Sequence, residues 1–196
     1  LDDTLCAYWE AARIGLWRAF DKHRPEGYTT EEMVNFWAVA FREFAPALKK
    51  TDWYARYLVD GGSTRLEQMR RTLVHANCGD LHLAQQIADA YALERDAHLK
   101  LFGDAVQVLT ALKAKYPLGL ITNGPADVQR QEIATLGIAR FFDHIFIEGE
   151  MGIGKPEPEV FRRAEAAVGL APHQILFVGN SYGHDIQPAI ENRWRT

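Results

Sequence analysis

Two cysteines among 196 residues are too few for a disulfide framework, and neither Cys6 nor Cys78 belongs to a CxxC pair. We therefore expect two free thiols in a reducing compartment, which favours a cytoplasmic location. No apolar run approaches the roughly 18 residues needed to cross a bilayer, so no membrane association is predicted.

The chain also lacks an excess of positive charge. Lys and Arg number 22 against 26 Asp and Glu, which gives a net charge of −4. Nucleic-acid-binding surfaces are normally basic, so no nucleic-acid partner is expected. Hydrophobic residues make up 47% of the chain and charged residues 24%, which excludes intrinsic disorder and indicates a globular protein.

Several widespread catalytic signatures are missing from the sequence. It contains no GxGxxG, GxxxxGK[ST] or HExxH pattern. These absences argue against dinucleotide binding, a P-loop NTPase and an HExxH zinc enzyme.

The second half of the chain alternates between two patterns. Short apolar runs at 118–122, 144–147 and 175–179 are typical of buried strands. Helical patterns at 126–136, 158–168 and 185–191 follow them, and a polar, glycine-rich loop is expected at 148–156. Strands that alternate with helices predict a parallel sheet with right-handed crossovers.

In the first half, from about residue 8 to 112, the sequence pattern is typical of helices. Apolar residues such as Trp9, Leu16 and Phe20 recur at helical spacings, and Thr29 or Thr30 is predicted to start a helix. Connections between strands and helices usually have roughly 2–6 residues. We therefore predict that residues 8–102 form an inserted helical domain. Residues 1–7 and 103–196 are then expected to form a Rossmann-like α/β core.

Four polar clusters follow predicted strand ends, where α/β proteins place their sites. They are Asp2-Asp3-Thr4, Thr122-Asn123-Gly124, Gly154-Lys155-Pro156 and Gly179-Asn180-Ser181 with Asp185. Each cluster alone is ordinary loop chemistry. Because the carboxyl ends of parallel strands share one edge of a sheet, the four together predict a single site.

In this combination the chain resembles the haloacid dehalogenase superfamily, whose members are mostly phosphatases. The family's Asp-x-Asp-x-Thr motif is matched from its second position onward, at Leu1-Asp2-Asp3-Thr4. The resemblance implies a nucleophilic Asp immediately before Leu1 in the parent chain, and first and last strands outside the given residues. A polypeptide that begins at Leu1 is expected to form no covalent intermediate. The helical domain resembles the family's all-helical cap.

The resemblance also implies residue roles. Catalytic roles are expected for Asp2 as general acid/base, for Thr122 and for Lys155. The residues expected to bind substrate are Thr4, Thr122, Asn123, Gly124 and Lys155. Mg²⁺ ligands are expected at Asp2, Asn180 and Asp185, because carboxylate and amide oxygens are the hard ligands this ion prefers. A Lys ammonium and a Thr hydroxyl suit phosphate oxygens.

The leading hypothesis is a Mg²⁺-dependent phosphomonoesterase acting on a small phosphorylated metabolite, such as a nucleotide or a sugar phosphate. Asn180 stands where the family usually has Asp and brings no charge. A 2-haloacid dehalogenase, which needs no metal, therefore stays open. Arg65, Arg70 and Arg71 could hold its substrate carboxylate, or form a solvated helix face. A catalytically inactive protein that binds a ligand or partner is the third alternative. The sequence does not indicate the oligomeric state.

Overall fold

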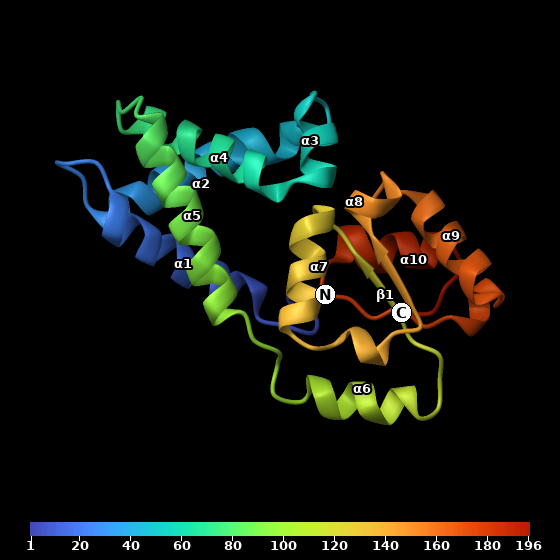
Figure 1. The fold of residues 1–196 in the computed structure, drawn as a ribbon. Coiled ribbons are helices and arrows are strands. Elements are labelled where there is room, and N and C mark those ends of the chain that lie inside the picture. Colours follow the sequence, from blue (N-terminus) through green and yellow to red (C-terminus); the bar gives the residue numbers. More distant parts are fainter. The chain divides into compact units, whose positions relative to one another are not determined.

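The computed structural model describes residues 1–196, which form two compact units (Figure 1). Tyr8–Lys100 make up the first, here called the helical unit. Leu1–Ala7 together with Leu101–Thr196 make up the second, here called the core unit. The core unit is therefore built from two stretches of chain that the helical unit separates in sequence.

The helical unit consists of five helices. They are α1 (Tyr8–His23), α2 (Thr30–Leu48), α3 (Trp53–Val59), α4 (Gly61–His75) and α5 (Leu81–His98). The helical texture predicted for this region is confirmed. The helices of the structure are too short or too polar to span a membrane.

Helix starts in this unit are fixed by side-chain caps. Thr29 precedes α2 in a capping box: its Oγ1 accepts from the Glu32 N–H at 3.2 Å, and Glu32 Oε2 accepts from the Thr29 N–H at 2.8 Å. The carboxylates of Asp60 and Asp80 cap α4 and α5 in the same sense. The predicted start of α2 is therefore confirmed at Thr29.

The helical unit is held together by contacts of α1 with α5 and of α2 with α4. Gly15 permits the contact of α1 with α5, since a Cβ at this position would lie 2.8 Å from the main-chain nitrogen of Arg95. Buried apolar side chains fill the space between the helices; the largest that are fully buried are Phe20, Met33, Met69, Leu73 and Ile87. Burial of such side chains contributes most of the stability of a helical assembly of this size.

The core unit contains a parallel pair of strands, β1 (Gly119–Thr122) and β2 (His144–Ile147). Their register pairs Gly119 with His144 and Thr122 with Ile147. The helical elements of this unit are α6 (Ala105–Lys113), α7 (Ala126–Thr135), η1 (Ala139–Phe141), α8 (Glu148–Met151), α9 (Pro158–Val168), η2 (Pro172–Gln174), the π-helix η3 (Tyr182–Ile186) and α10 (Gln187–Glu191). The predicted α/β class with a parallel sheet is confirmed.

The apolar centre of the core unit lies around Phe161 of α9. Its ring makes edge-to-face contacts with Phe177 at 5.8 Å and Trp194 at 5.2 Å between ring centroids. Ile121 of β1 and Val160 of α9 are buried in the same cluster. These contacts attach the segment around Phe177 to α9 and position the site residues that follow it in sequence.

The strand predicted at 175–179 is wrong as a regular strand. The segment makes one isolated parallel bridge, Leu176 with Arg195. The Arg195 N–H donates to the Ile175 carbonyl at 2.9 Å, and the Phe177 N–H donates to the Arg195 carbonyl at 2.8 Å. Ile175 and Phe177 pack inward, whereas Leu176 and Val178 are exposed. The apolar alternation survives, but a regular strand also needs a longer hydrogen-bonded neighbour.

Two further sequence predictions need correction. The loop predicted at 148–156 begins with the short helix α8, which ends at Gly152 in the left-handed conformation. The helix predicted from residue 185 begins at Gln187 instead, because Tyr182–Ile186 form the π-helical turn η3. The N-cap of this turn, Ser181, accepts the His184 N–H at 3.3 Å. This early turn brings Asp185 back toward the loop that follows Gly179.

Candidate active site

Lys155 and Asp185 form a buried ion pair beyond the sheet of the core unit. The Lys155 Nζ donates to Asp185 Oδ1 at 2.5 Å, and the two side chains are 10% and 5% exposed. Asp185 Oδ2 accepts the Ser181 N–H at 3.0 Å, which fixes the carboxylate. The Lys155 ammonium also lies 5.5 Å from the centre of the Phe177 ring. A cation held away from water in this way is a strong local charge.

Asn123, directly after β1, holds the backbone of Lys155. Its Nδ2 donates to the Lys155 carbonyl at 2.7 Å, and its Oδ1 accepts the Lys155 N–H at 2.8 Å. One amide therefore satisfies both main-chain groups of the lysine. The arrangement joins the segment after β1 to the loop before α9.

Gly124 and Glu148 connect the segment after β1 to the start of α8. The Gly124 N–H donates to Glu148 Oε2 at 3.0 Å, and the Gly124 carbonyl accepts the Gly149 N–H at 3.0 Å. Gly124 has a φ of +139°, and a Cβ there would lie 2.9 Å from Gln129 Cγ. At Gly154, a Cβ would lie 2.5 Å from the Glu148 carboxyl carbon. A side chain at Gly124 would be strained by this backbone conformation, and one at Gly154 would displace the Glu148 carboxylate.

Thr122 ends β1 with its hydroxyl turned toward α7. Its Oγ1 donates to Gln129 Oε1 at 2.6 Å, and Gln129 Nε2 donates to Glu132 Oε2 at 2.8 Å. All three residues are buried, with at most 3% exposed. Buried polar groups of this kind are stable because they are paired with one another.

The N-terminal cluster lies in the same unit. Asp2 Oδ1 is buried without a hydrogen-bond partner, and burial together with the Asp3 charge raises the Asp2 pKa, which the Lys155 charge partly opposes. Asp3 turns the chain with a φ of 52°, a conformation that Asp tolerates better than most residues. Thr4 Oγ1 donates to Asn180 Oδ1 at 3.1 Å, so the first and fourth clusters meet directly.

The candidate metal ligands are of the chemical type that Mg²⁺ prefers. Asp2, Asn180 and Asp185 offer oxygen atoms alone, and the unpartnered Asp2 Oδ1 is a buried acceptor without a proton donor. Mg²⁺ prefers such hard ligands. No group of three or more His, Cys, Asp or Glu side chains is placed to hold a metal ion. The Asp185 carboxylate is also occupied by Lys155 and Ser181.

Other residues that the sequence singled out lie elsewhere. Arg70 and Arg71 both bind Glu67, at 2.7 Å in each case, whereas Arg65 on the same helix has no ion-pair partner. His184 is exposed, with its Nδ1 3.2 Å from Ser181 Oγ.

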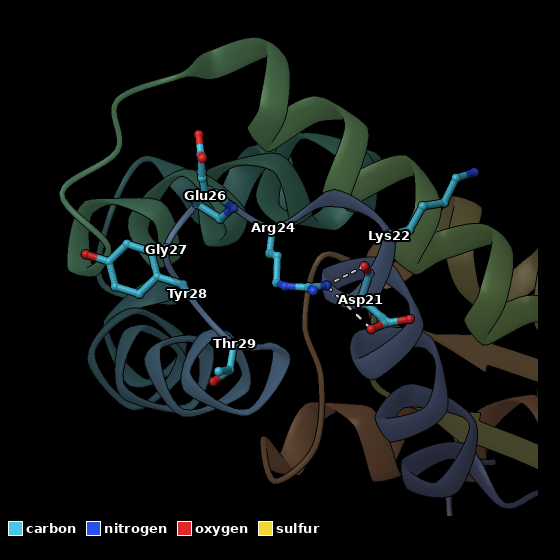
Figure 2. A pocket seen from close by; sticks show the side chains of 8 residues that line it. Asp21, Lys22, Arg24, Glu26, Gly27, Tyr28 and Thr29 are labelled. Carbon is cyan, nitrogen blue, oxygen red and sulfur yellow. Dashed lines mark hydrogen bonds and ion pairs between the residues drawn. The ribbon is translucent and has the colours of Figure 1, made fainter.

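A shallow pocket of about 530 Å³ lies at the turn from α1 to α2, where Arg24 reaches back to Asp21 (Figure 2). It is lined by Asp21, Lys22, Arg24, Pro25, Glu26, Gly27, Tyr28 and Thr29. No residue of the four clusters contributes to it.

Sequence reasoning assigns no role at the site to Gln129 or Glu148. Both are polar residues that the fold buries, at 2% and 1% exposure. A signal existed for Gln129, since Gln129 and Glu132 stand three residues apart on one face of α7 together with the buried Val128 and Ile133. Glu148 offered no comparable pattern, because it begins a helix too short to show periodicity.

Comparison with known families assigns the chain. The haloacid dehalogenase-like hydrolase family model matches residues 1–192, so the chain belongs to this family of hydrolases. The resemblance inferred from the four clusters is therefore confirmed.

Curated relatives are phosphatases. Phosphoserine phosphatase of Thermus thermophilus is 34% identical over 145 residues, which cover 69% of this chain and 57% of the relative. Glyceraldehyde 3-phosphate phosphatase of Methanopyrus kandleri is 34% identical over 101 residues, 51% of this chain and 43% of the relative. N-acylneuraminate-9-phosphatase of Mus musculus is 32% identical over 105 residues, 54% and 42% of the two chains. The chain spans about half the length of these relatives.

Solved structures share the fold. The HAD-hydrolase YfnB from Bacillus subtilis, bound to magnesium, superposes with a TM-score of 0.75 at 18% identity, covering 99% of this chain and 81% of that one. A 2-haloacid dehalogenase from Pseudomonas syringae pv. Tomato gives a TM-score of 0.65 at 25% identity, covering 100% and 81%.

Proposed function

We propose that the parent protein is a Mg²⁺-dependent phosphomonoesterase that acts on a small phosphorylated metabolite through an aspartyl-phosphate intermediate. The observation that carries the proposal is the buried Lys155–Asp185 pair, held by Asn123 beyond the end of β1. A fixed, desolvated cation at this edge of the sheet suits a phosphate dianion.

The relatives support this class of substrate. Their names specify phosphoserine, glyceraldehyde 3-phosphate and N-acylneuraminate 9-phosphate, which are all small phosphorylated metabolites. We extend that class, including nucleotide and sugar phosphates, to this protein. The free thiols of Cys6 and Cys78 support a cytoplasmic location.

Each site residue has a proposed task. Lys155 binds phosphate oxygens, the Thr122 hydroxyl donates to one of them, and Asp2 gives a proton to the leaving alkoxide and later removes one from water. The nucleophile is the aspartate that we propose immediately before Leu1 in the parent chain; its attack forms the aspartyl phosphate and releases the alcohol. Thr4, Asn123 and Gly124 shape the loops around the phosphate.

Asp2, Asn180 and Asp185 would hold the metal through oxygen atoms. When bound, Mg²⁺ supplies positive charge that offsets the repulsion between an anionic nucleophile and a phosphate ester. The contact of Asn180 with Thr4 lies beside the N-terminal cluster, in which Asp2 Oδ1 has no hydrogen-bond partner.

The test is phosphate release by the parent protein from a panel of small phosphate monoesters, with Mg²⁺ and with a chelator. We expect metal-dependent release, abolished in Lys155→Met. The matched control is Lys113→Met, which removes a lysine paired with Asp143 at the surface and is expected to keep activity. No metal-dependent release from any ester, or a residue other than Asp before Leu1 in the parent gene, would refute the proposal.

A second candidate is a 2-haloacid dehalogenase. It is favoured by the uncharged Asn180 and by the likeness, at 25% identity, to the enzyme from Pseudomonas syringae. Halide release from a 2-haloacid that is insensitive to chelator, without phosphatase activity, would establish it in place of the first.

A further inference from the structure

Gln129 accepts the hydrogen bond of the Thr122 hydroxyl and thereby determines its orientation. It is the fourth residue of α7 and 2% exposed. Its side chain packs against Gly124, where even a Cβ would lie 2.9 Å from Gln129 Cγ. The glutamine side chain therefore lies against both the end of β1 and the glycine that follows it.

The hydrogen bonds of Gln129 fix the orientation of its amide. Nε2 faces the Glu132 carboxylate at 2.8 Å, and a carboxylate accepts hydrogen bonds rather than donating them. The carbonyl Oε1 is left for Thr122, 2.6 Å away.

A threonine hydroxyl has one proton. Because Oε1 of Gln129 can only accept, the Thr122 proton points at Gln129 and away from any other acceptor. The same proton is the one that Thr122 would donate to a phosphate oxygen in the proposed function. A bound phosphate and Gln129 therefore compete for it.

We propose that Gln129 is an affinity-determining residue of this site, which weakens phosphate binding by holding the Thr122 proton. The inference rests on the proposed function and acts through Thr122. A neutral hydrogen bond of this type has a net strength that corresponds to about a two- to tenfold change in binding. Removing the acceptor should release that factor to the ligand.

The experiment is a double-mutant cycle in the parent protein. Gln129→Met removes the amide at similar volume, and Thr122→Val removes the proton. We expect Gln129→Met to lower KM, and the inhibition constant of inorganic phosphate, by about two- to tenfold. In the Thr122→Val background the same substitution should leave both constants unchanged, because no proton remains to be released. Gln85→Met, which removes an exposed amide bonded to Asp89, is the control.

Two additional measurements keep the inference testable. If Gln129→Met fails to fold because Glu132 loses its donor, Gln129→Lys retains a donor and still lacks the acceptor; its added charge cancels in the cycle with Thr122→Val. If the wild type releases no phosphate, the proposed function fails. Calorimetric binding of inorganic phosphate to the wild type, the two single variants and the double variant then tests the inference alone. An unchanged or weaker affinity in Gln129→Met, a gain that persists without Thr122, or a wild type that binds no phosphate overturns it.

Discussion

The side chain of Asn123 makes two hydrogen bonds to the main chain of Lys155, 32 residues later in the sequence. Its amide nitrogen donates to the carbonyl and its amide oxygen accepts the N–H, at 2.7 and 2.8 Å. The ammonium at the other end of that lysine meets Asp185. The position of the buried cation therefore depends on an amide, which has both a donor and an acceptor.

Substitution of Asn123 should impair activity without removing any charge from the site. Asn123→Ala loses both hydrogen bonds, and Asn123→Asp also places a carboxylate against the Lys155 carbonyl. We expect kcat/KM for a phosphate ester to fall roughly ten- to hundredfold in both variants, since small displacements of catalytic groups have effects of this size.

The control for this prediction is Asn192→Ala. Asn192 also donates its amide to a main-chain carbonyl of the core unit, that of Pro188 at 2.8 Å, but belongs to none of the four clusters. It should change kcat/KM by less than about threefold. Equal losses in Asn123→Ala and Asn192→Ala would show a general effect on folding and contradict a role for Asn123 in placing Lys155.

The fold could be predicted where a pattern was local. The apolar run before Asn123 and the threonine at the start of α2 identify their elements, because burial and capping act on neighbouring residues. The segment around Phe177 shows the limit. Its alternation is strand-like, but its pairing is confined to Arg195, and no local pattern specifies the neighbour of a strand.

The site shows the same division. Lys155 and Asp185 could be singled out by residue type and order, yet their direct contact depends on the π-helical turn η3, which sequence periodicity does not reveal. Gln129 and Glu148 escaped prediction because each acts through a partner in a different segment, Thr122 and Gly124. Such pairings are consequences of the fold rather than of local sequence.

The Lys155–Asp185 pair should matter for stability as well as chemistry. Lys155→Met leaves a buried carboxylate without its cation, which typically costs about 3–5 kcal/mol in unfolding free energy. Lys155→Met combined with Asp185→Asn removes both charges and keeps an acceptor for the Ser181 N–H, so much of the loss should be recovered. Urea unfolding of the two variants measures this.

Lys113→Met provides the matched control for that cycle. Its ammonium pairs with Asp143 where both side chains are at least 33% exposed. Exposed pairs contribute about 0–1 kcal/mol, so the control should be nearly neutral. A double variant no more stable than Lys155→Met alone would contradict the buried-pair account.

The helical unit should lose stability in acid through Glu67. Hydrogen bonds from Arg70 and then Arg71 hold the pKa of this carboxyl group below its ordinary value of 4.5, although burial opposes them. A carboxylate with a depressed pKa stabilises the folded state above the unfolded-state value. That contribution is lost as pH falls through the lower, folded-state value.

Thermal unfolding between about pH 7 and about pH 3 tests this linkage. Glu67→Gln should unfold at a lower temperature than the wild type near neutrality, and the gap should narrow below pH 4.5. Glu26→Gln, in the exposed turn before α2, is the control and should follow the wild type throughout. A gap that stays constant with pH would assign the effect of Glu67 to packing.

The two thiols should differ sharply in reactivity. Cys6 is fully buried, and burial, reinforced by the Asp2 charge, raises the pKa of its thiol to about 12. A raised pKa keeps the thiol protonated and unreactive near pH 8, since the thiolate is the nucleophile.

Cys78 is half-buried and accessible by comparison. A disulfide reagent should therefore modify one thiol quickly in the native protein and two in denaturant. Cys78→Ser should abolish the fast phase and leave Cys6 to react only as the core unit opens, whereas a fast phase retained in this variant would contradict the burial of Cys6.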